Sequence, residues 1–364
     1  MKLIEHNLKR KFNSMFLHGK NKPIFIDTPF NIITKQGSFR ILLLRQDRIG
    51  DVLISTSVIR ILRQNLPDAE IDILLSKKNI GVKQAVIKYI NNFWLYDKNI
   101  LHTILLLRKL RKRKYDVVVD MLDNASTTSS IFVKYIKPKF SIGIDKENRN
   151  IYTHIVPLLD KNSFHPVERL AQILLAFGIN PSQQDLSIEY DLSEDETESA
   201  LKKLGAKTKP IRLGINLAGS DLSKFWGVEN NIKLINKIQQ NYPDIEIVLF
   251  AEEKYSTSVK IIVEQTNIKP APAVKSVKEF ASLLSLCDII ITTDTAAVHF
   301  ASAWKKPCLA LYIYNKESGT GMPWYPYKTA NRILTTSEKL SDITVDEVYQ
   351  AFENLYDEAI KHKI

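Results

Sequence analysis

Short apolar segments alternate with longer amphipathic segments along almost the whole chain. In the first half, this pattern predicts strands near residues 40–45, 70–75, 116–120 and 141–144. It predicts helices near residues 51–65, 79–90, 99–113, 126–136 and 165–177. Because strands that alternate with helices pair in parallel, the chain is expected to adopt an α/β fold with helices on both faces of a sheet.

The alternation begins again in the second half. Strands are predicted near residues 211–215, 245–250, 288–292 and 307–312, and the segment 180–185 with the strand-like residues 186–190 is predicted to connect the two halves. Helices are predicted near residues 193–204, 229–241, 254–265, 276–285, 295–303 and 344–360. The chain has 364 residues, which is longer than the chains that usually fold around a single hydrophobic core. Two doubly wound domains are therefore expected. Their predicted bounds are a basic extension at 1–37, a first domain at 38–185, a second at 186–343 and a terminal helix at 344–364.

The distribution of charge indicates which binding partners the protein could have. Lys and Arg number 51 against 40 Asp and Glu, which gives a net charge of +11. The excess gathers in the first 40 residues and in the run from Arg108 to Lys114. Such runs are often solvated helix faces, but they also attract polyanions such as an anionic bilayer or a phosphorylated saccharide. Nucleic acid is disfavoured because no basic groove with interleaved aromatic residues is visible.

Composition and chain ends predict a protein of the cytoplasm. The first residues have scattered charges where a signal peptide needs an apolar run. No segment approaches the length of a membrane span. The two cysteines, Cys287 and Cys308, lie beside predicted core strands and are expected to be reduced packing residues.

A carboxylate follows the first predicted strand directly. The segment from Arg45 to Asp51 lies between the strand and the next helix, at the edge of a parallel sheet where ligands bind. Gly50 is expected to allow a sharp turn that projects Asp51 outward. Alternatively, Asp51 only caps the helix.

Two further motifs follow in the second half. Asp294-Thr295-Ala296 opens a short helix that contains His299, and a helix N-terminus can bind a phosphate. In the purely structural alternatives, Asp294 caps the helix and His299 is a core histidine. Upstream, a strand at 211–215 is followed by Gly219-Ser220 and then by Lys224-Phe-Trp226.

Together the three motifs resemble glycosyltransferase family 9, the ADP-heptose:lipopolysaccharide heptosyltransferases, over residues 38 to 350. The resemblance implies a GT-B fold, in which two Rossmann-like domains face each other across a cleft. It also implies an inverting transfer of heptose to the lipopolysaccharide inner core, at the cytoplasmic face of the inner membrane. No cofactor and no metal ion are expected, since no Asp-x-Asp motif accompanies the nucleotide site.

Roles follow from the matching positions. The catalytic residues are predicted to be Asp51, as the base that takes the acceptor proton, and Lys224, as the group that neutralises the departing diphosphate. Donor binding is predicted for Gly219, Ser220, Trp226, Glu252, Asp294, Thr295, Ala296 and His299. Acceptor binding is predicted for Arg45, Arg48, Gly50, Arg111, Lys112 and Arg113.

Departures from the family pattern leave the donor sugar open. Leu217 replaces a usual proline, Ala296 replaces a frequent glycine, and the loop after Tyr312 differs in shape. Two other functions remain possible from the sequence. One is a different sugar-nucleotide enzyme of the same fold, such as a 2-epimerase, and the other is a non-catalytic protein that binds polyanions.

Overall fold

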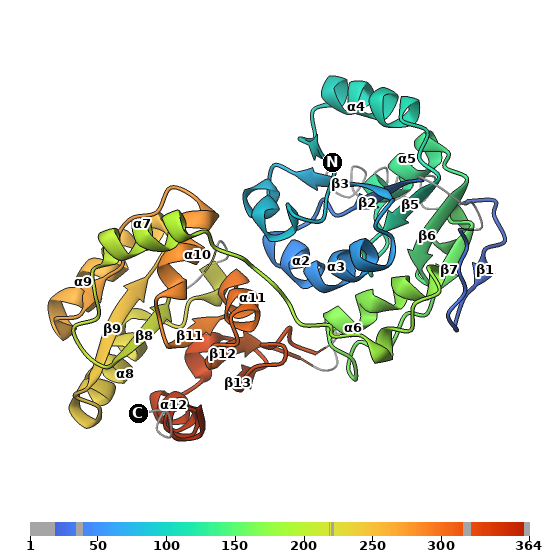
Figure 1. The fold of residues 1–364 in the computed structure, drawn as a ribbon. Coiled ribbons are helices and arrows are strands. Elements are labelled where there is room, and N and C mark those ends of the chain that lie inside the picture. Colours follow the sequence, from blue (N-terminus) through green and yellow to red (C-terminus); the bar gives the residue numbers. More distant parts are fainter. Residues whose placement is uncertain (1–18, 34–38, 218, 220–221, 316–321, 360–364) are drawn as a thin grey trace, which may run out of the picture. The chain divides into compact units, whose positions relative to one another are not determined.

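The computed structural model describes residues 19–33, 39–217, 219, 222–315 and 322–359. The chain divides into two compact units, Met1–Leu186 and Ser187–Ile364. Each unit has one sheet between two layers of helices (Figure 1). The fold is therefore the predicted α/β class with two doubly wound units.

The first unit has a sheet of order β1-β7-β6-β5-β2-β3-β4, in which all pairs of neighbouring strands are parallel. Its strands are β1 (Ile24–Phe25), β2 (Arg40–Leu44), β3 (Glu70–Ser76), β4 (Asn92–Tyr96), β5 (Val117–Asp120), β6 (Phe140–Ile144) and β7 (His154–Val156). Its helices are α2 (Ile49–Ile54), α3 (Thr56–Asn65), α4 (Ile100–Lys112), α5 (Thr127–Ile136) and α6 (Pro166–Ala171), with 3₁₀ turns at Ile80–Val86, Arg149–Ile151, Gln172–Ala176 and Pro181–Gln183.

The second unit has a sheet of order β10-β9-β8-β11-β12-β13, also parallel throughout. Its strands are β8 (Ile211–Asn216), β9 (Ile245–Phe250), β10 (Lys269–Pro270), β11 (Ile289–Thr293), β12 (Cys308–Ile313) and β13 (Asn331–Thr336). Its helices are α7 (Glu194–Leu204), α8 (Val228–Asn241), α9 (Ser256–Thr266), α10 (Val277–Ser285), α11 (Ala296–Ala303) and α12 (Val345–Ala359), with 3₁₀ turns at Leu222–Lys224, Glu253–Tyr255 and Leu340–Asp342.

Hydrophobic burial explains the central strands. The strand β2 has four consecutive fully buried residues, Ile41 to Leu44, because helices cover both faces of the sheet. On one face, α4 and α5 pack over the core through Leu110 and Phe132. In the second unit, α12 packs on α8 and on β12 and β13, so the C-terminal helix is part of that unit.

Several sequence predictions are wrong in detail. Part of the predicted extension joins the first sheet as β1, because Ile24 and Ile26 donate backbone hydrogen bonds to Thr153 and Ile155, both at 2.9 Å. The segment 186–190 is not a strand. The expected helix at 51–65 is interrupted at Ser55, and the one at 79–90 is a 3₁₀ turn.

Candidate active site

Asp51 lies at the carboxyl edge of the first sheet, in the first turn of α2. Its Oδ2 accepts a hydrogen bond from the Arg48 N–H at 2.9 Å, so the side chain does cap the helix. The same carboxylate remains 11% exposed, on the loop side of β2. Gly50 is helical, and it is not among the described glycines with positive φ. The expected glycine turn is therefore wrong, since the helix already begins at Ile49.

Arg45 holds Asp51 in place. Its Nε donates to the Asp51 carbonyl at 2.8 Å, and its Nη2 lies 3.5 Å from Asp51 Oδ1. Its Nη1 donates to the Met121 carbonyl at 2.7 Å. Because this guanidinium is buried and engaged from inside the protein, Arg45 is a positioning group and not the acceptor ligand that we expected. The Arg48 side chain is exposed at the same edge and stays a candidate acceptor ligand.

More charged side chains gather at this edge than the motif indicated. Asp120 ends β5 and is fully buried, with Lys146 Nζ at 2.8 Å and the Tyr152 hydroxyl at 2.6 Å from its Oδ2. Arg169 pairs with Asp123 at 2.7 Å just beyond the same strand. A carboxylate at or just after a strand end is the sequence signal that could have found both.

Asp47 is the other carboxylate of the motif. Burial raises its pKa to about 6; the Arg45 charge opposes this rise and the Asp51 charge adds to it. Its Oδ2 accepts from Arg45 Nη1 at 3.3 Å. Its Oδ1 is buried, without a hydrogen-bond partner in the described part of the chain. A carboxyl with this pKa changes charge close to neutral pH.

The raised pKa predicts a pH-dependent effect of Asp47→Asn. Between about pH 4 and the folded-state pKa, the folded wild type keeps a proton that the unfolded chain has released, so its stability falls as pH rises. Asparagine removes this loss, and the variant should gain up to about 3 kcal/mol in free energy of unfolding across that window. Urea unfolding of both proteins at several pH values measures the gain. A difference that does not vary with pH would contradict it.

The basic run lies at the other edge of the first sheet. Arg113 follows α4, and its carbonyl accepts a hydrogen bond at 2.9 Å from Arg40, the first residue of β2. Its guanidinium pairs with Glu70 and lies 3.4 Å from Asp72. Asp51 follows the carboxyl end of β2. Arg113 is therefore engaged within its own unit, and the predicted acceptor-binding residues Arg111, Lys112 and Arg113 lie at the edge of the sheet opposite to Asp51.

In the second unit, Lys224 and Asp294 form an ion pair after the carboxyl ends of β8 and β11. Lys224 Nζ also donates to the Asp294 carbonyl at 3.1 Å. The two side chains are 25% and 40% exposed, so solvent and ligands reach both. The carboxylate of Asp294 does not cap α11, because it turns toward the lysine.

Thr295 is the N-cap of α11. Its Oγ1 accepts from the Ala297 N–H at 3.2 Å and from Asn216 Nδ2 at 3.1 Å. Ala296 is the first helical residue, so its N–H has no partner within the helix. A Cβ on Gly219 would come within 3.1 Å of Thr295 Cγ2, which shows how closely this loop approaches the helix start. Ser220 lies outside the described residues.

The remaining donor predictions fare differently. Trp226 is a core residue, 2% exposed, and its Nε1 donates to the Ile343 carbonyl at 2.8 Å, so its assignment to the donor is wrong. His299 is buried in α11, and the centroid of its ring lies 6.1 Å from that of the Trp324 ring. Glu252 is exposed just beyond the end of β9, with Lys254 Nζ at 3.5 Å.

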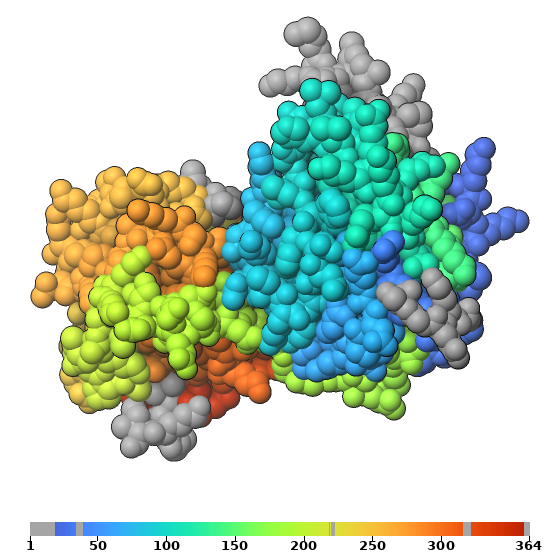
Figure 2. Space-filling view, turned by 45° about the horizontal axis from the view of Figure 1, so that its top comes forward, coloured from blue at the N-terminus to red at the C-terminus, as the bar shows by residue number. Residues whose placement is uncertain are grey.

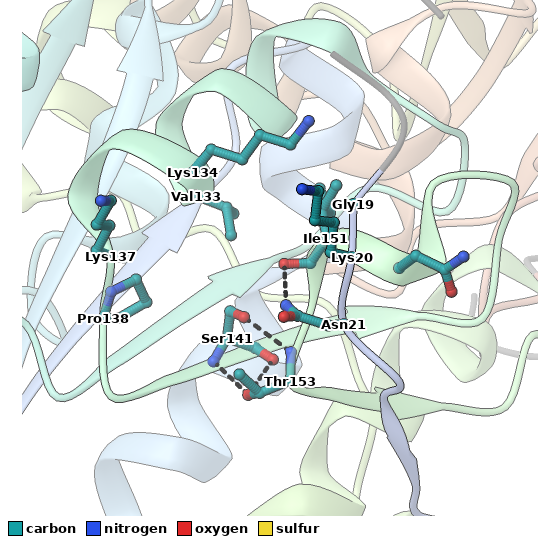
Figure 3. A pocket seen from close by; sticks show the side chains of 11 residues that line it. Gly19, Lys20, Asn21, Val133, Lys134, Lys137, Pro138, Ser141, Ile151 and Thr153 are labelled. Atoms are coloured by element: carbon teal, nitrogen blue, oxygen red, sulfur yellow. Dashed lines mark hydrogen bonds between the residues drawn. The ribbon is translucent and has the colours of Figure 1, made fainter. Parts of the chain in front are cut away.

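A cavity of about 310 Å³ lies elsewhere in the first unit (Figure 3). Lys20, Lys134 and Lys137 line it beside Ser141, which is near the start of β6. Because Asp51 follows the opposite end of this parallel sheet, the cavity is separate from the candidate active site.

A sequence profile described as glycosyltransferase family 9 (heptosyltransferase) matches residues 104–348. The chain belongs to glycosyltransferase family 9. The protein is thus a glycosyltransferase of the heptosyltransferase family for the lipopolysaccharide core, with the GT-B type of fold. Family membership favours this activity over a 2-epimerase or a non-catalytic binding protein.

Several family 9 relatives resemble most of the chain. Lipopolysaccharide heptosyltransferase 3 of Escherichia coli strain K12 is 26% identical over 283 residues, which cover 72% of this chain and 79% of that protein. The family 9 glycosyl transferase of Veillonella parvula DSM 2008 superposes with a TM-score of 0.74 at 20% identity, over 89% of this chain and 99% of that one. E. coli heptosyltransferase WaaC, solved with ADP-2-deoxy-2-fluoro heptose, gives 0.68 at 17% identity, over 87% and 99%.

Proposed function

We propose that this family 9 enzyme moves heptose from ADP-heptose to the lipopolysaccharide inner core, with inversion and without a metal ion. The observation that carries the proposal is the Asp51 carboxylate, which Arg45 holds at the carboxyl edge of the first sheet and which is largely buried, with 11% of the side chain exposed. The choice of donor is supported by the similar E. coli WaaC structure, which was solved with ADP-2-deoxy-2-fluoro heptose.

The reaction is a single displacement. The Asp51 carboxylate takes the proton of an acceptor hydroxyl while that oxygen attacks the anomeric carbon of the donor sugar. The bond from this carbon to the diphosphate oxygen breaks on the opposite face, and ADP leaves with the bonding electron pair. Because the nucleophile and the leaving group occupy opposite faces, the configuration at this carbon inverts.

The departing diphosphate needs positive charge. Lys224 and the N-terminus of α11 supply it in the second unit, where the Ala296 amide adds a hydrogen-bond donor. Before the donor binds, Asp294 neutralises Lys224. We infer that the diphosphate displaces the Asp294 carboxylate from the lysine, so the site is held ready without an uncompensated charge. Glu252, at the end of β9, is the candidate acceptor of hydrogen bonds from the ribose hydroxyls.

Replacing Lys224 with alanine tests the leaving-group assignment. The variant should lose about 1.5 to 3 kcal/mol of transition-state stabilisation, or roughly 10- to 150-fold in kcat/KM, since one charge-assisted hydrogen bond is removed. Lys237→Ala is the matched control, because Lys237 also pairs with a carboxylate, Asp346, but on an exposed surface. A chelator should leave the wild-type rate unchanged. Strict dependence on a divalent ion, with a Lys224 variant as active as the control, would overturn the assignment.

The reaction itself is tested by product analysis. The protein is incubated with ADP-heptose and with lipopolysaccharide from cells that lack core heptose, and the saccharide is examined by mass spectrometry and for anomeric configuration. We expect one added heptose with inverted configuration, and ADP release that depends on the acceptor. Conversion of the sugar nucleotide without an acceptor would indicate the 2-epimerase alternative instead.

The acceptor is lipid-linked, so we also propose peripheral contact with the cytoplasmic face of the inner membrane. In the described ranges, no helix is long and apolar enough to span a bilayer. The net charge of +11 supports attraction to anionic lipid headgroups.

A further inference from the structure

The helix α4 exposes large aliphatic side chains that a globular unit would normally bury. The exposed fractions are 76% for Ile100, 71% for Leu101, 41% for Ile104 and 52% for Leu105. The core face of the same helix is already supplied by Leu106, Leu107 and Leu110. The first half of α4 is therefore apolar on its outer face as well as on its inner face. A contiguous exposed apolar patch of this kind marks an interaction surface.

The outer face changes character along the helix. After the aliphatic patch of Ile100, Leu101, Ile104 and Leu105, its exposed positions are Arg108, Lys109, Arg111 and Lys112. No Asp or Glu occurs between Lys98 and Lys114. The nearest carboxylate before the helix, Asp97, is already paired with His102 at 2.6 Å and Lys77 at 3.7 Å. Aliphatic side chains next to cations that have no carboxylate partner in the described residues suit the boundary between headgroups and acyl chains of an anionic bilayer.

The patch lies at the edge of its unit that also carries Asp51. The helix α4 follows the carboxyl end of β4, which is parallel to β3 and β2. Its apolar start is therefore at the same edge as Asp51, whereas its basic end approaches the opposite edge. Figure 1 shows α4 at the periphery of the unit, and Figure 2 shows residues of this segment on the surface.

We propose that the first two turns of α4 insert into the surface of an anionic lipid bilayer. Leu101 and Leu105 enter the acyl boundary, and Arg108 and Lys112 contact headgroup phosphates. This inference rests on the proposed function for the identity of the acceptor, and it specifies which surface meets the membrane. It keeps Lys112 from the basic run at 111–113 but not Arg113, because Arg113 is held by Glu70 and Asp72.

Vesicle sedimentation with the full chain tests the proposal. Wild type should bind vesicles that contain phosphatidylglycerol and should bind purely phosphatidylcholine vesicles more weakly. Leu101→Gln with Leu105→Gln should reduce binding at least about tenfold, since glutamine keeps the helix but removes apolar area. Leu201→Gln with Ile261→Gln is the matched control, because both residues are exposed aliphatic positions on helices of the other unit.

The cationic end is tested separately. Replacing Arg108 and Lys112 with glutamine should weaken binding to the anionic vesicles by about fivefold per charge, and salt should diminish this difference. Equal vesicle binding by wild type and the leucine variant would overturn the proposal. Loss of a dimer in the leucine variant, with vesicle binding unchanged, would instead assign the patch to a second copy of the chain.

Activity separates this inference from the proposed function. The leucine variant should turn over a water-soluble acceptor without acyl chains at the wild-type rate, and a vesicle-embedded acceptor more slowly. Impaired turnover of the soluble acceptor would show that α4 acts in the reaction and would contradict a purely lipid-binding role. If the wild type used neither acceptor, the proposed function would fail while the vesicle result would stand on its own.

Discussion

Asp51→Asn should lower kcat by at least about a hundredfold, within the 10²- to 10⁴-fold range that a general base contributes. The asparagine side chain can still accept a hydrogen bond from the Arg48 N–H, so the cap of α2 persists while the proton affinity of the carboxylate is lost. Donor affinity should not change, because the donor residues belong to the second unit. Single-turnover kinetics and calorimetric titration with ADP measure the two quantities.

Asp47→Asn is the matched comparison, since the two carboxylates contact the same arginine. The pKa of Asp47, raised to about 6 by burial, is close to the value that suits a base at neutral pH. Yet one of its oxygens is buried and the other faces Arg45, so we expect a smaller loss of turnover than for Asp51. If Asp47→Asn lost a hundredfold and Asp51→Asn kept the wild-type rate, the base would be Asp47.

Thermal unfolding distinguishes chemistry from folding. If Asp51 had only a structural role, Asp51→Asn would lower the melting temperature in parallel with activity, because the carboxylate both caps α2 and lies near Arg45. We expect Asp51→Asn to unfold close to the wild-type temperature, since the cap hydrogen bond is retained. Parallel losses of stability and turnover would remove the case for Asp51 as the base.

The sequence predicted the buried strands well because they are continuous apolar runs between turn signals. It missed the edge strands β1, β4, β10 and β13, whose side chains are exposed or only partly buried, and also the short buried strand β7. The strand β1 consists of Ile24 and Phe25, both exposed, and is defined only by pairing with β7, some 130 positions later. Such pairing depends on tertiary contacts that no local pattern contains.

The same reason explains the errors at the site. Trp226 follows Lys224 by two residues, but the partner of its indole N–H is Ile343, far along the chain. Arg113 belongs to a basic run, yet carboxylates of the neighbouring strand β3 hold it at the amino edge. The motif around Asp51 was informative because strand, turn and helix are contiguous there. The network of Asp120 and Lys146 joins the end of β5 to the segment after β6, and the sequence did not predict it.

That network has a consequence for stability and for the position of Asp51. Asp120 and Lys146 are both buried, and their charges lie 2.8 Å apart. Met121, the next residue after Asp120, accepts the hydrogen bond of Arg45, which in turn holds Asp51. The pair therefore fixes the strand end on which the candidate base depends.

Lys146→Met should lower the free energy of unfolding by about 3 to 5 kcal/mol at neutral pH, because it leaves the Asp120 carboxylate buried without its cation. The Tyr152 hydroxyl at 2.6 Å compensates only in part. Adding Asp120→Asn to Lys146→Met should restore most of the loss, since the double variant has no buried charge. Urea unfolding of Lys146→Met, Asp120→Asn and the double variant measures these differences. Additive losses in the double variant would show that the two charges act independently and that the ion pair does not hold this edge of the sheet.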